Sequence, residues 1–440
     1  MKLTVLVESL WVLGTRLILR AANLVVFMIL ARALSVAEFG FYGYVMATAV
    51  VLSVAFDLGQ RQSTAFFIGR EPENRADYTT HMLFMWLVLG SAGTLACWLM
   101  LRVGNYEESY GLLILVGALN TAPMLLLRTG QGAFLGAGRL DAYNRSELVS
   151  RIVMVTGTAG LWLADGLTIA AALWLLLASH ATAALYLLWR LAGDLRPAAL
   201  VDWPLIRRML RHGAVFAGSV LMMILLGRIG IWLVSAMMGE EALGVYFGVL
   251  RLGEMLADVA GAVGLVIFSH GVRAADPRES AQDAIRTARL VTAVMALVAV
   301  AAMLVAPLFL WLLLGSAYAD ETLPFRIIML GTLFGCFNVM LFPCLSAQGL
   351  ARVGIWAYGL GCAVASLGCW LLIPPLGLEG AAIAYLLAQI VVASSITLVY
   401  RHRFGFRAGE ILLLQREDLA VIRQLAGRVR ARLGRRFTGG

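Results

Sequence analysis

The residues of this sequence best placed to do chemistry are charged side chains inside long apolar stretches. They form four groups, each within one stretch: Arg16 and Arg20; Asp57 and Arg61; Arg228; and Arg251, Glu254 and Asp258. Spacings of three, four or seven residues place the members of a group on one helical face. Guanidinium groups there would bind phosphate oxygens through paired N–H donors. The carboxylates would bind a coupling ion or balance the arginines.

These charges cannot lie in lipid. A charge at the centre of a membrane helix costs about 2.5–3.5 kcal/mol, so five or six would cost on the order of 15 kcal/mol. A whole protein is stabilised by only about 5–15 kcal/mol. Two interpretations remain open: a shared polar cavity that binds an anion, or internal ion pairs such as Arg61–Asp57 and Arg251–Glu254 that hold helices together.

Other chemical signals are weak. His180 could carry a proton, but a hydrogen-bonded structural histidine is the favoured interpretation. The five cysteines lie in apolar stretches without a metal-binding or disulfide pattern. The sequence contains no HExxH, Walker A or GxSxG motif. We therefore expect no enzyme activity, no metal and no cofactor.

Composition gives the class of protein. Of 440 residues, 61% are hydrophobic and 14% are charged, whereas soluble domains have about 45–50% and 25%. This predicts an all-α polytopic membrane protein with about twelve transmembrane helices. The expected spans are at about 10–31, 41–66, 83–102, 110–130, 148–164, 168–190, 213–237, 244–268, 289–314, 325–346, 353–373 and 380–400.

Three short patterns recur in the two halves of the chain. Gly40-Phe-Tyr matches Gly244-Val-Tyr, Gly136-x-x-Arg matches Gly349-x-x-Arg, and Gly166-Leu matches Gly377-Leu, at offsets of 204, 213 and 211 residues. Six spans per repeat imply two six-helix lobes related by a pseudo-twofold axis along the membrane normal. We expect an N-terminal lobe at 1–195, a cytoplasmic linker at 196–212, a C-terminal lobe at 213–403 and a tail at 404–440.

Arginine placement predicts the orientation. Alternate loops are rich in arginine and the opposite loops nearly lack it, so both termini are expected in the cytoplasm. Segment 401–440 holds ten arginines and three acids. Within it, residues 410–433 favour a basic amphipathic helix on anionic lipid, with a partner-binding helix as the alternative. No basic face outside the tail suggests nucleic-acid binding.

Several of these stretches resemble a known family. Residues 31–42 with Asp57-Leu-Gly59, residues 239–246 with Arg251 and Glu254, and residues 413–419 resemble bacterial polysaccharide and O-antigen flippases. Those proteins belong to the multidrug/oligosaccharidyl-lipid/polysaccharide exporter superfamily. The sequence departs from the family at Gly227, where members often carry an acid before the arginine. Twelve spans, rather than fourteen, match the lipid II flippase branch less well.

The resemblance implies a flippase in the bacterial inner membrane. It would move an undecaprenyl-pyrophosphate-linked oligosaccharide across the bilayer by alternating access, for exopolysaccharide or O-antigen biosynthesis. Arg16, Arg20, Arg61, Arg228 and Arg251 are the candidates for binding the pyrophosphate and glycan. Asp57, Glu254 and Asp258 are the candidates for coupling to H⁺ or Na⁺ or for balancing charge. A glycan polymerase or other assembly proteins are the expected partners.

Two alternatives come from other functional classes. A cation-coupled multidrug exporter of the same superfamily would be expected to carry more acids and fewer arginines in its cavity. A membrane glycosyltransferase or ligase would need catalytic carboxylates on a large outer loop. The longest expected outer loop, at about 315–324, offers only Asp320 and Glu321.

Overall fold

The computed structural model describes residues 22–104, 106–195, 201–415 and 418, in which helices are the only regular elements. Ten segments of these ranges are long and apolar enough to cross a membrane, and they match ten of the expected spans. The expected span 10–31 lies mostly outside the described residues, and the expected span 148–164 falls in a helix with more charged residues. The protein is therefore an all-α polytopic membrane protein of about twelve transmembrane helices.

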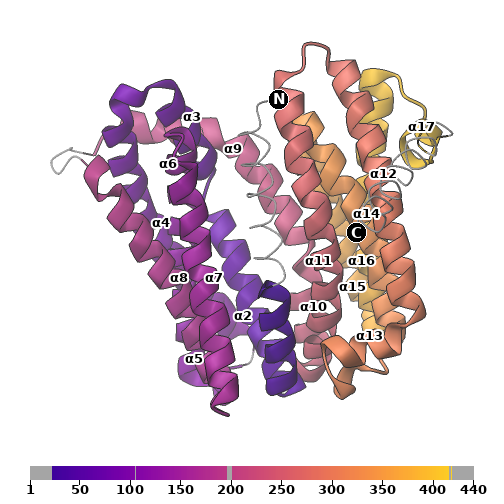
Figure 1. The fold of residues 1–440 in the computed structure, drawn as a ribbon. Coiled ribbons are helices and arrows are strands. Elements are labelled where there is room, and N and C mark those ends of the chain that lie inside the picture. Colours follow the sequence, from indigo (N-terminus) through magenta and orange to yellow (C-terminus); the bar gives the residue numbers. More distant parts are fainter. Residues whose placement is uncertain (1–21, 105, 196–200, 416–417, 419–440) are drawn as a thin grey trace, which may run out of the picture.

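The helices form two bundles (Figure 1). The first contains the helical segment Ala22–Ala33, α2 (Val36–Ala55), α3 (Gln60–Arg70), α4 (Arg75–Val103), α5 (Glu107–Leu119), α6 (Thr121–Gly136), α7 (Leu140–Leu163) and α8 (Ile169–Leu191). The second contains α10 (Ile229–Met238), α11 (Glu240–Arg273), α12 (Pro277–Leu304), α13 (Ala306–Leu313), α14 (Thr322–Ala347), α15 (Arg352–Leu376) and α16 (Leu378–Phe404). Helix α9 (Trp203–Leu226) runs between them, and the short α17 (Ala408–Leu412) follows the second bundle.

Two expected spans are broken where charged residues lie. Span 41–66 divides into α2 and α3 at residues 56–59, because Leu58 and Gly59 have φ angles of 47° and 81°. Gly59 also lies against the backbone of Gly213 so closely that a Cβ atom would come within 2.3 Å of the Gly213 carbonyl oxygen. Span 213–237 divides into α9 and α10 at Gly227 and Arg228. The sequence analysis did not predict these two breaks.

Helix α9 connects the two bundles. Its first turns pack on α3 and its later turns pack on α15. Asp202 caps its start by accepting a hydrogen bond from the backbone N–H of Leu205, at 3.1 Å. The second half of the expected linker at 196–212 is therefore helical and continuous with the helix that follows, while residues 196–200 lie outside the described residues.

The bundles touch at one end and separate at the other, like a V (Figure 1). At the closed end α2 packs against α11, and the repeat glycines Gly40 and Gly244 meet there. A Cβ atom on Gly40 would lie 2.4 Å from the Glu240 carbonyl oxygen, and one on Gly244 would lie 1.9 Å from that of Val36. Only glycine permits this approach of the two backbones.

Hydrogen bonds also link the bundles at the closed end. The Trp232 Nε1 donates to the Thr48 Oγ1 at 3.1 Å, and the Tyr110 hydroxyl donates to the Glu240 Oε2 at 3.0 Å. The closed end is therefore held by both packing and polar contacts.

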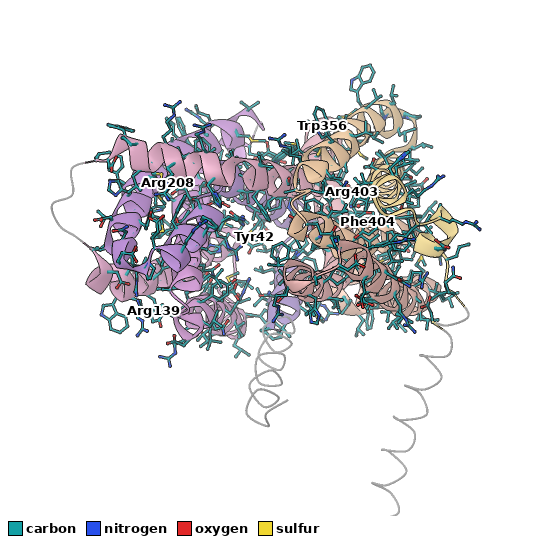
Figure 2. All side chains as sticks on the ribbon, turned by 90° about the horizontal axis from the view of Figure 1, so that it is seen from above. Tyr42, Arg139, Arg208, Trp356, Arg403 and Phe404 are labelled. Carbon is teal, nitrogen blue, oxygen red and sulfur yellow. The ribbon has the colours of Figure 1, made fainter. Side chains whose placement is uncertain are left out.

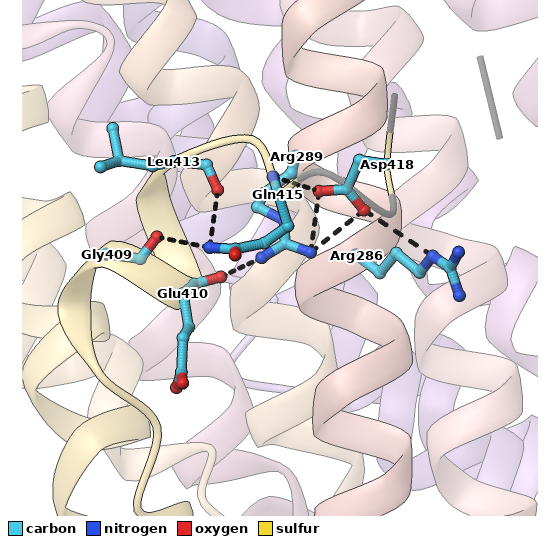
Figure 3. A network of polar contacts seen from close by, with 7 residues as sticks. All are labelled: Arg286, Arg289, Gly409, Glu410, Leu413, Gln415 and Asp418. Carbon is cyan, nitrogen blue, oxygen red and sulfur yellow. Dashed lines mark hydrogen bonds and ion pairs between the residues drawn. The ribbon is translucent and has the colours of Figure 1, made fainter. Parts of the chain in front are cut away.

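The start of the tail is fixed to the second bundle (Figure 3). The fully buried Asp418 carboxylate lies 2.9 Å from the Arg289 guanidinium and 3.7 Å from the Arg286 guanidinium of α12. Arg289 also donates to the Glu410 carbonyl oxygen of α17. The amphipathic helix expected at 410–433 falls mostly outside the described residues; within its described start, α17 ends at Leu412 and residues 413–415 are not helical.

Candidate functional site

The predicted charges of the second bundle form one cluster. The break between α9 and α10 places Arg228 beside Glu254 of α11, which accepts hydrogen bonds from both Nη atoms of Arg228. Arg251 donates to the Glu254 Oε2 at 2.8 Å. Side-chain exposures are 17% for Arg228, 19% for Glu254 and 30% for Arg251. One carboxylate thus bridges two arginines, leaving a net charge of +1.

This cluster bears on the departure at Gly227. Gly227 lies against the Glu254 Oε1, which would be 3.5 Å from a Cβ atom at that position. The acid that partners Arg228 therefore comes from the neighbouring helix instead of the preceding residue.

The predicted charges of the first bundle are arranged differently. Asp57 lies at the break between α2 and α3, is 2% exposed and accepts a hydrogen bond from the backbone N–H of Arg61 at 3.2 Å. The Arg61 guanidinium instead donates to the hydroxyl of Tyr143 on α7, at 3.2 Å. Of the two ion pairs considered from the sequence, Arg251–Glu254 is present, and the Arg61 side chain is directed to Tyr143.

Two further arginines lie in the first bundle. Arg128 of α6 and Arg151 of α7 line a polar cavity of about 230 Å³, together with Glu147 and His180. Asp57 and Arg61 are the charged residues that act most strongly on the Arg128 guanidinium. The buried Nε atom of Arg128 has no hydrogen-bond partner. His180 lies 3.0 Å from the Asn120 Oδ1, which is the hydrogen-bonded arrangement favoured from the sequence.

A second cavity joins the two bundles. It has a volume of about 100 Å³ and is lined by residues of the first bundle, including Tyr42 and Arg151, and by Phe247 and Arg251 of the second. Arg151 and His180 line both cavities. Seen from above, the buried Tyr42 lies between the two bundles (Figure 2). We call the two cavities together the central chamber.

The chamber is nearly balanced in charge. Its surroundings contribute Arg61, Arg128, Arg151, Arg228 and Arg251 against Asp57, Glu147, Glu254 and Asp258. The described part therefore has a net charge of +1 from five arginines and four acids. The predicted residues Arg16 and Arg20 lie outside the described residues.

Comparison of the sequence with curated proteins finds no match. Residues 29–322, more than half of the chain, match a family described as "Polysaccharide biosynthesis protein". The chain belongs to this polysaccharide biosynthesis family. The sequence-based assignment to the multidrug/oligosaccharidyl-lipid/polysaccharide exporter superfamily is thereby confirmed.

Solved structures of similar fold come from both transport branches. An inward-facing multidrug resistance MATE family transporter of the MOP superfamily is 18% identical, with a TM-score of 0.69 over 87% of this chain and 94% of its own. The lipid II flippase MurJ, in an inward closed conformation, is 12% identical, with a TM-score of 0.71 over 88% and 86%. A Pyrococcus furiosus MOP superfamily transporter with a binding pocket of reversed polarity is 15% identical, with a TM-score of 0.56 over 89% and 93%. These similarities show a shared fold.

The sequence analysis missed Arg128 and Arg151 because both lie near the ends of expected spans, where arginine is common. Arg128 follows three leucines, and Arg151 follows a polar stretch at the start of an expected span. One signal could have found them: Glu147 and Arg151 are four residues apart, which is the spacing of neighbours on a helix. No cluster of three or more potential metal ligands occurs among the residues that the structure describes.

Proposed function

We propose that this member of the polysaccharide biosynthesis family translocates an undecaprenyl-pyrophosphate-linked oligosaccharide by alternating access. One observation carries the proposal: Arg128 and Arg151 line the central chamber without a hydrogen bond or ion pair to any described residue. Guanidinium groups left without a partner in a polar cavity suit an anionic group that arrives with the substrate, and a pyrophosphate offers the matching oxygens.

The cluster around Glu254 suggests how substrate and ion are exchanged. A pyrophosphate bound to Arg228 and Arg251 would compete with Glu254 for the same donors. The released carboxylate would then take up H⁺ or Na⁺, and Asp57 and Asp258 are the further candidates for this coupling. Glu254 links α11 to Arg228 at the start of α10. Release of this carboxylate would therefore loosen the contact between α10 and α11.

The V shape supports access from one side at a time. The arginine-rich loops lie at the open end of the V. We assign this end to the cytoplasmic side of a bacterial inner membrane. The substrate would therefore enter from the cytoplasmic leaflet and leave outward when the bundles rock. The exported glycan would serve exopolysaccharide or O-antigen synthesis.

A multidrug exporter coupled to cations is the second candidate. The four carboxylates around the chamber favour it, since they could hold a cationic drug or a coupling ion. The fold is common to both functions and does not separate them.

Replacing Arg151 with glutamine separates the candidates. The purified protein is reconstituted into vesicles, and transfer of an undecaprenyl-pyrophosphate oligosaccharide between leaflets is measured. Loss of a charge-assisted contact predicts a fall of about tenfold or more in transfer. Arg145→Gln is the matched control, because Arg145 lies exposed on the same helix outside the chamber.

The outcomes are distinct. Equal transfer by Arg151→Gln and Arg145→Gln would remove the arginine from the substrate site. Drug efflux from the same vesicles, together with no lipid transfer by the unmodified protein, would favour the exporter.

A further inference from the structure

A second basic pocket lies between the end of α3 and the first turns of α9, separate from the central chamber. Its volume is about 1000 Å³, and its lining includes Phe66, Arg70, Trp203, Arg207, Arg208 and Arg211. We propose that this pocket binds the phosphate headgroup of an anionic phospholipid from the leaflet at the arginine-rich end of the bundles.

The charges of the pocket are largely uncompensated. Arg208 donates to the Glu71 carboxylate at 2.6 Å. Hydrogen bonds from Tyr78 and Arg208 hold the pKa of Glu71 below its usual value, so this acid stays ionised. The guanidinium groups of Arg207 and Arg211 form no hydrogen bond or ion pair with any other residue in the described ranges. Four arginines against one carboxylate leave three positive charges in excess.

Aromatic rings hold several of these groups in place. The Arg208 guanidinium lies 4.5 Å from the centre of the Phe67 ring, and that of Arg70 lies 5.7 Å from the centre of the Phe66 ring. The His212 ring stacks on Phe66 with centres 4.1 Å apart. The pocket thus combines fixed cations with an apolar floor, which suits a charged headgroup with acyl chains attached.

Helix length sets the depth of the pocket. Helices α9 and α10 have 24 and 10 residues, or about 36 Å and about 15 Å at 1.5 Å per residue. A bilayer is about 30 Å thick in its hydrocarbon core and about 40–45 Å with its headgroups. The first turns of α9 therefore extend into the headgroup layer. Trp203 is 66% exposed, as is common for tryptophan at a membrane interface.

Native mass spectrometry of the full chain in detergent tests the proposal. The probes are dioleoyl phosphatidylglycerol, dioleoyl phosphatidylcholine and inorganic phosphate. We expect phosphatidylglycerol to bind about tenfold more tightly than phosphatidylcholine, and the double variant Arg207→Gln/Arg211→Gln to lose this preference. The matched control is Arg401→Gln/Arg403→Gln, because both residues are exposed at the end of α16. It should keep the preference.

Three results would overturn the proposal. The first is an unchanged preference in the pocket variant, and the second is an equal loss in the control, which would indicate diffuse charge. The third is displacement of phosphatidylglycerol by an equal concentration of inorganic phosphate, which would indicate a soluble ligand. If the double variant does not fold, Arg70→Gln is measured in its place, and an unchanged preference there has the same meaning.

Discussion

At the scale of single residues, Glu254 is the key to the second bundle. Its carboxylate forms ion pairs with both Arg228 and Arg251. We predict that Glu254→Gln, which keeps the shape and removes the charge, leaves Arg228 and Arg251 without the carboxylate that pairs with both. The expected loss of stability is about 1–3 kcal/mol, since the cluster is mostly buried. Thermal unfolding of the purified protein in detergent measures it.

Glu241→Gln is the control for this prediction, because Glu241 is exposed in the first turn of the same helix. An unfolding midpoint of Glu254→Gln equal to that of the control would show that the two arginines do not depend on this carboxylate.

The sequence identified this site incompletely for a physical reason. Charges deep within apolar runs, such as Arg228, are conspicuous because lipid cannot hold them. Arg128 and Arg151 lie near the ends of expected spans, where a long side chain can reach the membrane surface. Only the tertiary packing of α6, α7 and α8 directs these two into the chamber. The sequence likewise did not reveal hydrogen-bond partners on other helices, such as Tyr143 for Arg61.

At the scale of helices, the contact of α2 with α11 controls the closed end. We predict that Gly244→Ala separates the two helices there. The added methyl group would clash with backbone atoms of Val36, which cannot move away as a flexible side chain could. Gly261→Ala is the control: it lies on the same helix and its Cβ atom would meet open space.

Spin labels at Leu112 and Met238 would measure this change, because both are exposed and each lies two residues from Tyr110 or Glu240, which are hydrogen-bonded across the bundles. The expected result is a longer or broader distance distribution in Gly244→Ala than in Gly261→Ala. Identical distributions would mean that the glycine contact does not hold the end closed.

Helix existence was predictable and helix breaks were not. Hydropathy located ten spans that the structure contains, because burial in lipid requires long apolar runs. It gave no sign of the breaks at Gly59 and Gly227, since a break changes backbone angles without changing composition. A helix start, in contrast, can have a local sequence signal. The Ser35-x-x-Glu38 capping box begins α2, and there the Ser35 backbone N–H donates to the Glu38 Oε2 at 2.9 Å.

At the scale of the whole molecule, the proposed transport mechanism depends on the asymmetry of the V. Contacts between the bundles gather at the end where α2 meets α11, and α9 joins the bundles along the side. The proposed rocking would therefore break the Gly40–Gly244 contact and the Trp232–Thr48 hydrogen bond. These contacts are few and local, so a modest differential binding energy could shift the equilibrium between the two states.

The direction of transport depends on which end of the V faces the cytoplasm. Arginine placement predicts the open end there, because cytoplasmic loops retain positive charge. We predict that a cysteine at Glu241, at the closed end, reacts with a membrane-impermeant maleimide added to intact cells from which the outer membrane has been removed. A cysteine at Leu140, which is 57% exposed and begins α7 directly after Arg139, should react only after the inner membrane is permeabilised. The five native cysteines are buried and provide a low background. Labelling of Leu140→Cys in intact cells, with protection of Glu241→Cys, would reverse the orientation and require the substrate to enter from the opposite leaflet.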